Sequence, residues 1–377
     1  MFDVHIIEFC CLMAVFAIAT PFCNKLWRLP IQRKRPDSAT GSKPPLSVVI
    51  AVHNQAKELE ANLPSILSQE YAPGYEVIVV NEASTDDTED VLKRLSQEHP
   101  HLYVTFIPAS SHYVSRRKLA LTVGVKAAKH DWVVFTNGNC QPCSRHWLDE
   151  MASACTPETD IVLGYTSLRT PSCINRFHYF STLCADLRSA QGKWIYGYVG
   201  GNLLLRKQVF LQHNGFLKNL KYIRGEYDFM VNEYGQDNRI ATVLSPTATI
   251  LQLQSSGKAL HENLISQIET RKHLRHHTVH SLTNTLDATL LYTNYALQTA
   301  TAIYAICISQ YILLAAALTC FTLTLVLRLL IARRALRTFG EKLPLWKAPV
   351  IELADVWMSV YNRLCYMLAN KADFIRK

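Results

Sequence analysis

The stretch that decides the fold is Trp132-Val-Val-Phe-Thr-Asn-Gly-Asn-Cys-Gln-Pro142. Its first five residues are apolar or β-branched and form a run of strand length, and a polar turn follows directly. In an open α/β sheet, ligands bind just beyond the carboxyl ends of the strands. The side chains of Asn137 and Asn139 are therefore expected at a ligand-binding edge of such a sheet.

Similar apolar runs recur along the chain and alternate with helical patterns. Leu46–Val52 and residues 76–80 are continuous apolar runs, and residues 115–128 have the pattern of a basic helix. Buried strands that alternate with helices predict an α/β fold with a largely parallel sheet. The other strand candidates are residues 102–107, 161–168, 199–205 and 248–253.

The chain of 377 residues is basic, with 39 Lys and Arg against 30 Asp and Glu, a net charge of +9. The charge is concentrated in a few segments, including residues 25–35, 116–118 and 328–337. No recognition-helix pattern accompanies these segments, so we expect no nucleic-acid partner. Positive charge next to apolar segments instead indicates a membrane surface.

The eleven cysteines are an odd number without the spacing of a disulfide framework. Several lie inside apolar segments, which favours reduced thiols in a cytosolic setting. Cys140-x-x-Cys143 has a spacing that redox and zinc sites use. No second pair at ligand spacing accompanies it, so a turn without metal is the preferred interpretation.

Three segments are apolar enough to predict membrane helices. Residues 1–24 precede a basic segment, so they are predicted to be an uncleaved anchor whose C-terminal side is cytoplasmic. The chain has no acidic or basic residue between Ala288 and Leu327, which predicts two transmembrane helices within residues 286–331. The remaining segments are a basic, Pro-containing linker (25–45), a globular domain (46–280) and an amphipathic cytoplasmic tail (340–377).

Four segments in order resemble family 2 glycosyltransferases. Val48–Asn54 resembles their first strand and nucleotide-base loop, and residues 78–88 resemble their second strand with its acidic loop. Residues 117–132 lead into the metal-binding turn with the family's spacing, and residues 225–232 lie where the family has its Glu-Asp catalytic-base motif. The flanking apolar segments are similar to those of a membrane-anchored bacterial subgroup.

The resemblance implies a GT-A fold, which is a nucleotide-sugar-binding, Rossmann-like mixed sheet. It also implies transfer of a sugar from a nucleotide-sugar donor to a lipid-linked or other envelope glycan acceptor. The expected location is the bacterial inner membrane, with the globular domain on the cytoplasmic face. The lipid bilayer and a partner membrane protein are the other partners that we expect.

The resemblance further implies Mg²⁺ or Mn²⁺ at the central turn, where relatives have two carboxylates. Here both are amides, Asn137 and Asn139, which lack the charge that hard divalent ions prefer. We therefore expect no metal ligands. The turn is interpreted either as a nucleotide site without metal, in which amides and the basic residues Arg117 and Lys118 bind phosphate, or as a turn without a ligand. Arg117 and Lys118 also fit a solvated basic helix face.

Other family positions are retained in part. The nucleotide-binding candidates are Val52, Asn54, Glu82, Lys118, Asn137 and Asn139. Glu82 keeps a carboxylate where relatives contact the base, although it also fits a position near a helix N-terminus. The catalytic candidates are Asp228 and Glu226, because Tyr227 would be a poor base with an ordinary pKa of about 10. Both acids also suit the start of a helix.

Two functions follow from these substitutions. The first is an active glycosyltransferase that works without a conventional metal site. The second is a catalytically inactive relative that serves as a scaffold or regulatory partner in a membrane complex. The altered positions Asn81, Asn137, Asn139 and Tyr227 favour the second function if they arose independently.

Overall fold

The computed structural model describes residues 2–31, 42–108, 115–235, 239–253, 257–370 and 374–375. The chain divides into two compact units. One comprises Met1–Leu29 and His277–Met358, and the other comprises Pro30–His276 and Ser359–Lys377. The second unit contains all of the β-strands and therefore the predicted ligand-binding edge.

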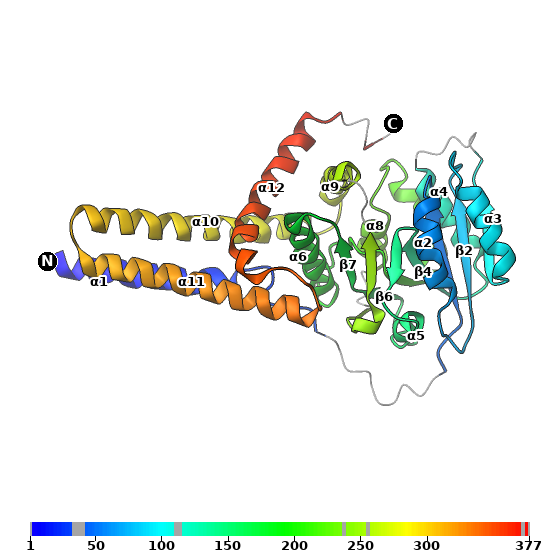
Figure 1. Cartoon of the computed structure of the whole chain (residues 1–377), viewed down its shortest axis with the longest axis horizontal. Coiled ribbons are helices and arrows are strands. Elements are labelled where there is room, and N and C mark those ends of the chain that lie inside the picture. The colour runs from blue at the N-terminus through cyan, green and yellow to red at the C-terminus, as the bar shows by residue number, and fades with distance from the viewer. Residues whose placement is uncertain are drawn as a thin grey trace. The chain divides into compact units, whose positions relative to one another are not determined.

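The main sheet has seven strands in the order β3-β2-β1-β4-β8-β6-β9 (Figure 1). Every neighbouring pair is parallel except the two pairs that β8 makes with β4 and β6. One reversed strand makes the sheet mixed, which confirms the predicted mixed α/β sheet. The strands are β1 (Leu46–Val52), β2 (Tyr75–Asn81), β3 (Leu102–Phe106), β4 (Trp132–Asn137), β6 (Ile161–Gly164), β8 (Leu203–Arg206) and β9 (Ile240–Val243).

A smaller sheet holds the exit of the central turn. β10 (Ile250–Leu253) pairs antiparallel with β5 (Cys140–Pro142) and parallel with β7 (Thr166–Arg169). The single strand predicted for residues 161–168 is therefore two strands, β6 and β7, because the chain changes partner after Gly164.

Helices cover both faces of β1. Val48 and Ile50 belong to one buried cluster with apolar residues of α2, whereas Val49, which points to the opposite face, packs against α4. A Cβ atom on Gly124 of α4 would lie 2.4 Å from the Val49 side chain, so the close contact requires glycine. The helices of this unit are α2 (Ala56–Leu67), α3 (Thr88–Glu98), α4 (Arg116–Ala127), α5 (Trp147–Ala152), α6 (Cys173–Ala190), α7 (Lys207–Gln212), α8 (Glu226–Tyr234) and α9 (Gly257–Lys272).

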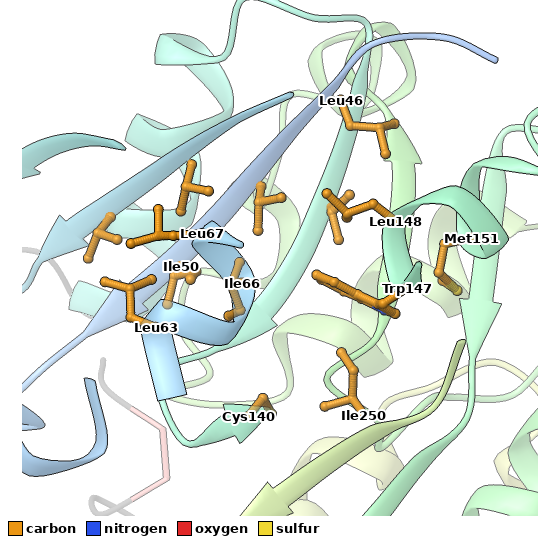
Figure 2. Close-up of a cluster of buried hydrophobic side chains, with 14 of the residues drawn as sticks. Leu46, Ile50, Leu63, Ile66, Leu67, Cys140, Trp147, Leu148, Met151 and Ile250 are labelled. Carbon is orange, nitrogen blue, oxygen red and sulfur yellow. The ribbon is translucent and has the colours of Figure 1, made fainter. Parts of the chain in front are cut away.

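A cluster of buried apolar side chains packs against the strands next to the central turn. Leu63 and Ile66 of α2 and Trp147 of α5 lie around β1 and β4 (Figure 2). The Asn62 side chain donates to the Gly138 carbonyl (3.2 Å), and the Trp147 indole donates to a buried asparagine, Asn202 (3.0 Å). Packing of two helices therefore sets where the turn lies.

The end of the chain packs against the α/β unit. Residues 359–377 are grouped with that unit. The Ile223 N–H donates to the Phe374 carbonyl (3.0 Å), and Tyr222 forms a β-bridge with Ile375. The unit also begins at Pro30 and ends its first segment at His276, compared with the predicted 46 and 280.

The other unit is helical. It contains α1 (Phe2–Phe22), α10 (His277–Cys307), α11 (Tyr311–Thr338), the turn η4 (Leu345–Lys347) and the first part of α12 (Ala348–Leu368). Among the described residues, only α11 is long and apolar enough to cross a membrane, and the apolar part of α1, Ile6–Phe22, is shorter. Of the three predicted spans, one is thus supported by length and composition.

α10 is less apolar because it carries polar side chains, and several of these are buried. Asn294 donates to Thr324 of α11 (3.1 Å), and Gln298 donates to Asn294 (2.9 Å). Arg328 of α11 donates to Asp287 of α10 at 3.2 Å. These buried polar groups of α10 therefore bond inside the unit.

Candidate functional site

The carboxyl ends of β2, β1 and β4 meet at one edge of the main sheet. In the strand registers, Val52 pairs with Asn81, and Ala51 pairs with Asn137. The polar residues after these strands are therefore neighbours, as expected for parallel strands. The Glu82 N–H donates to the Val52 carbonyl at 2.8 Å. The Val52 side chain is fully buried, so only its backbone reaches this edge.

Asn54 connects the loops after β1 and β2. It has a left-handed φ of 51°, which asparagine tolerates better than most residues. Its N–H donates to Ser84 Oγ (2.9 Å), and its Oδ1 accepts from the Thr85 N–H (2.8 Å). Asn81 Oδ1 accepts from the Ser84 N–H (3.0 Å). Both amides thus shape the edge of the sheet, and Asn54 stays exposed.

Asn137 is held at the end of β4 by residues from distant parts of the chain. Its Oδ1 accepts a short hydrogen bond from Arg117 Nη2 and another from the Tyr227 hydroxyl at 2.7 Å. A Cβ atom on Gly201 would lie 2.6 Å from Asn137 Nδ2. Glycine is needed at this position because a side chain would displace the amide.

Arg117 is the charged centre of this edge. Its Nε lies 3.9 Å from Glu226 Oε2, and its charge also acts on Glu82. Burial raises the pKa of Glu82, and Arg117 opposes that rise. Burial would lower the pKa of Arg117, but the neighbouring phenol and two carboxylates outweigh it and raise the pKa above its ordinary value. The Arg117 side chain is still 31% exposed, so a ligand can reach it.

Lys118 has a different role from the one that the sequence predicts. Its side chain is fully buried, and its ammonium donates to the carbonyls of Asn219 (2.7 Å) and Tyr222 (2.6 Å). It also lies over the Phe229 ring, 4.9 Å from the centroid. Burial lowers its pKa to about 8. Lys118 therefore secures the segment before α8 and does not face a ligand at the sheet edge.

Asn139 is turned toward the smaller sheet. Its Nδ2 donates to the Leu253 carbonyl (2.7 Å), and its own carbonyl accepts from the Leu253 N–H (2.9 Å). These bonds attach the turn to the end of β10. Asn137 and Asn139 thus have separate partners, although the sequence predicts a common role for them.

The two predicted acids of α8 lie in different surroundings. Asp228 is buried, and its Oδ1 accepts from the Tyr198 N–H (2.9 Å) and from Arg271 Nη2 (3.0 Å). Arg271 also binds both carboxylate oxygens of Asp186 (3.1 and 2.5 Å). Burial raises the pKa of Asp228 to about 6, the Arg271 charge opposes the rise, and Asp186 adds to it.

Glu226 begins α8 after Gly225, whose φ is 89°. Glu226 is buried, and among the described residues its Oε1 has no hydrogen-bond partner, whereas its Oε2 lies near Arg117. A buried oxygen of this kind is costly to leave unpaired, which points to a missing donor such as a ligand hydroxyl.

These residues do not fit a divalent ion. No group of three or more His, Cys, Asp or Glu side chains that could bind a metal occurs in the described part of the chain. The Asn137 oxygen already accepts from Arg117 and Tyr227, and the Arg117 guanidinium places a positive charge where an ion would need negative ligands. No step of the chemistry is therefore assigned to a metal.

The sequence predicts Arg117 and Lys118 together as candidates to bind phosphate, but it places only Lys118 among the nucleotide-binding residues and does not indicate Gly201. A signal for the difference exists, because Lys118 shares its helix face with Leu121 and Val125, both fully buried. Residues spaced by three or four positions lie on one face of a helix. No comparable pattern in the local sequence indicates that Tyr227 is a hydrogen-bond partner of Asn137.

Residues 47–213 match the sequence model described as "Glycosyl transferase family 2". Glycosyltransferase AglE from Haloferax volcanii is 26% identical over 135 residues, which are 35% of this chain and 43% of that protein. Poly-β-1,6-N-acetyl-D-glucosamine synthase from Staphylococcus epidermidis is 30% identical over 90 residues, which are 24% of this chain and 20% of that protein. The matches therefore span less than half the length of these relatives.

The fold is similar to that of a solved archaeal enzyme, the mannosyltransferase PcManGT from Pyrobaculum calidifontis in complex with GDP-Man and Mn²⁺. The TM-score is 0.54 at 16% sequence identity, over 95% of this chain and 98% of that chain. At this identity the similarity shows a common fold.

Proposed function

Because residues 47–213 match the model of glycosyl transferase family 2, we propose that this chain transfers a sugar from a nucleotide-sugar donor to a lipid-linked or other envelope glycan acceptor. The observation that best supports this proposal is the grouping of Glu82, Asn137 and Arg117 at one strand edge. Open α/β sheets bind ligands at this place. The reaction proceeds without a conventional divalent-metal site.

The transfer forms one bond and breaks another at the anomeric carbon of the sugar. An acceptor hydroxyl oxygen bonds to that carbon, the bond from the carbon to the diphosphate breaks, and the diphosphate leaves with added negative charge. A base takes the hydroxyl proton. Of the two predicted acids, Glu226 is the better base because its Oε1 is free within the described structure. Asp228 already accepts two hydrogen bonds, so it positions the segment at Tyr198.

The same proposal places the chain at the inner membrane of a bacterium. α11 spans the bilayer, α10 returns beside it, and α1 is the anchor. The Arg328–Asp287 ion pair joins the two ends of the charge-free stretch. The part of each helix between this ion pair and the turn that joins α10 to α11 is about 20 residues long. This is close to the length that crosses a bilayer core of about 30 Å. The α/β unit then lies on the cytoplasmic face.

Transfer is tested with the whole chain in detergent, a panel of nucleotide sugars and a lipid extract of bacterial membranes. We expect one donor to leave its sugar in the lipid phase. Glu226→Gln should abolish transfer without changing the thermal unfolding midpoint, whereas Glu98→Gln, an exposed change on α3, should leave transfer intact. Absence of transfer and of donor binding across the panel would contradict the proposal.

A second candidate is a catalytically inactive scaffold, which the surroundings of Tyr227 favour. Burial raises the pKa of Tyr227 above its usual range, so its phenol donates hydrogen bonds and does not act as a base. This function requires absence of transfer together with co-purification of a membrane-bound glycosyltransferase. Transfer that depends on Glu226 would exclude it.

A further inference from the structure

Two positions at which this chain departs from the acidic motifs that it resembles are joined by a hydrogen bond. Asn137 and Tyr227 are bonded to each other, and the same Asn137 oxygen accepts from Arg117. The Arg117 guanidinium thus lies beside Asn137, at the position where the resembled motif has a metal-binding carboxylate. Its charge has the same sign as that of the ion that the family uses.

Arg117 is placed to bind a further anion. One N–H group is used on Asn137, and 31% of the side chain is exposed at the sheet edge. A guanidinium has several N–H donors in a planar fork, which suits phosphate oxygens. Lys118, its neighbour in sequence, does not have this role because its buried ammonium donates hydrogen bonds to two backbone carbonyls.

Positive and negative side chains lie together at this edge of the sheet. Arg116, Arg117 and Arg224 interact electrostatically with Glu82 or Glu226. Arg224 also interacts with Glu262, so three guanidinium groups face three carboxylates and their charges balance. An aspartate at position 137 would add a negative charge and would pair with Arg117 directly, since charge-assisted hydrogen bonds are the stronger ones.

We propose that Arg117 binds the diphosphate of the nucleotide donor in place of a divalent ion, and that position 137 is an amide so that Arg117 stays available. This inference rests on the proposed function, because it assigns a role within the same donor site. It also changes what restoring the acids would do. Asn137→Asp would neutralise Arg117 and would not rebuild a metal site.

The test is calorimetry on the whole chain in detergent with UDP and GDP as probes, in EDTA and then with Mn²⁺. We expect a diphosphate to bind in EDTA and Arg117→Gln to weaken that binding by about tenfold or more, which is about 1.4 kcal/mol. Arg117→Gln should weaken the binding of the corresponding monophosphate by a smaller factor. Arg94→Gln, which changes an exposed arginine of α3, should bind like the unchanged protein.

The asparagine variants form the second arm. Asn137→Asp should weaken diphosphate binding in EDTA, and Mn²⁺ should not restore it. Asn139→Asp should have a smaller effect, because Asn139 bonds to Leu253. Arg117→Lys keeps the charge and should retain part of the affinity. It is the control for a loss of binding that is caused by misfolding of Arg117→Gln.

The outcomes separate the two proposals. Diphosphate binding that needs Mn²⁺, or that survives both Arg117 changes, would overturn the role of Arg117 and leave the proposed function standing. Gain of Mn²⁺-dependent binding in Asn137→Asp would also overturn it. No binding of any nucleotide sugar or nucleotide, with or without Mn²⁺, would overturn the proposed function and this inference together.

Discussion

The Tyr227 hydroxyl donates a 2.7 Å hydrogen bond to Asn137 Oδ1 across 90 positions of sequence. These residues occupy the base and metal positions of the resembled motifs. A phenol can donate this bond to an amide oxygen, which can accept from Arg117 as well. The two substitutions therefore fit each other. They form one arrangement, which weakens the argument that they are independent losses.

Removing the Tyr227 hydroxyl tests this arrangement. Tyr227→Phe should lower the free energy of unfolding by about 1 kcal/mol, because a buried hydrogen bond to Asn137 is lost. Chemical denaturation of the whole chain measures the change. Tyr103→Phe, at an exposed tyrosine of β3, is the control and should leave stability unaltered. Equal stability of both variants would show that the bond contributes nothing.

Gly201→Ala should displace the Asn137 side chain. The new Cβ would approach Asn137 Nδ2 to 2.6 Å, and overpacking of this kind costs about 1–3 kcal/mol. UDP or GDP affinity should fall together with stability, since Arg117 loses its partner. Gly192→Ala is the matched control, because its nearest contact would be an ordinary 3.5 Å. A tolerated Gly201→Ala with unchanged nucleotide affinity would argue against a constrained amide.

Lys118→Met should separate stability from binding. The change leaves the carbonyls of Asn219 and Tyr222 without their donor, so we expect a loss of about 2 kcal/mol in unfolding free energy. Diphosphate affinity should stay unchanged, in contrast to Arg117→Gln. A loss of affinity without a loss of stability would return Lys118 to the phosphate site that the sequence predicts.

Asp228 should make stability depend on pH. Its pKa is raised from 3.8 to about 6 in the folded chain, so between these values the folded state binds more protons than the unfolded state. Its contribution is therefore greatest below pH 4 and is lost as the pH rises through 6. We expect Asp228→Asn to gain about 3 kcal/mol relative to the unchanged protein between pH 4 and 7.

Denaturant unfolding at several pH values measures this difference. Glu98→Gln, at an exposed carboxylate of α3, should run parallel to the unchanged protein across the range. If the difference in unfolding free energy between Asp228→Asn and the unchanged protein does not change with pH, the prediction is wrong. The Asp228 carboxylate would then titrate as it does in the unfolded chain.

The membrane arrangement can be tested with topology reporters. Fusions after residue 35, which lies outside the described residues, and after Leu343 should both report the cytoplasm, because basic segments stay on that side. A reporter inserted between Ser309 and Gln310, at the turn between α10 and α11, should report the opposite side. A cytoplasmic signal at the turn would remove the hairpin from the membrane.

Local sequence was sufficient for the strands that build the site. Continuous apolar runs identify β1, β2 and β4, because a strand buried on both faces has little choice of residue. Since parallel strands end at the same edge, the sequence also predicted that Asn54, Glu82 and Asn137 would be neighbours. The register of β1 with β2 and β4 agrees with that prediction.

Tertiary structure alone decided which basic residue faces the ligand-binding edge. Arg117 and Lys118 are adjacent and differ by about 100° around α4, so the outcome depends on what packs against each face. The carbonyls that bind Lys118 and the hydroxyl that bonds Asn137 come from residues about a hundred positions away. Long-range packing of this kind leaves no periodic trace in a single sequence, and it placed Arg117, not Lys118, beside Asn137.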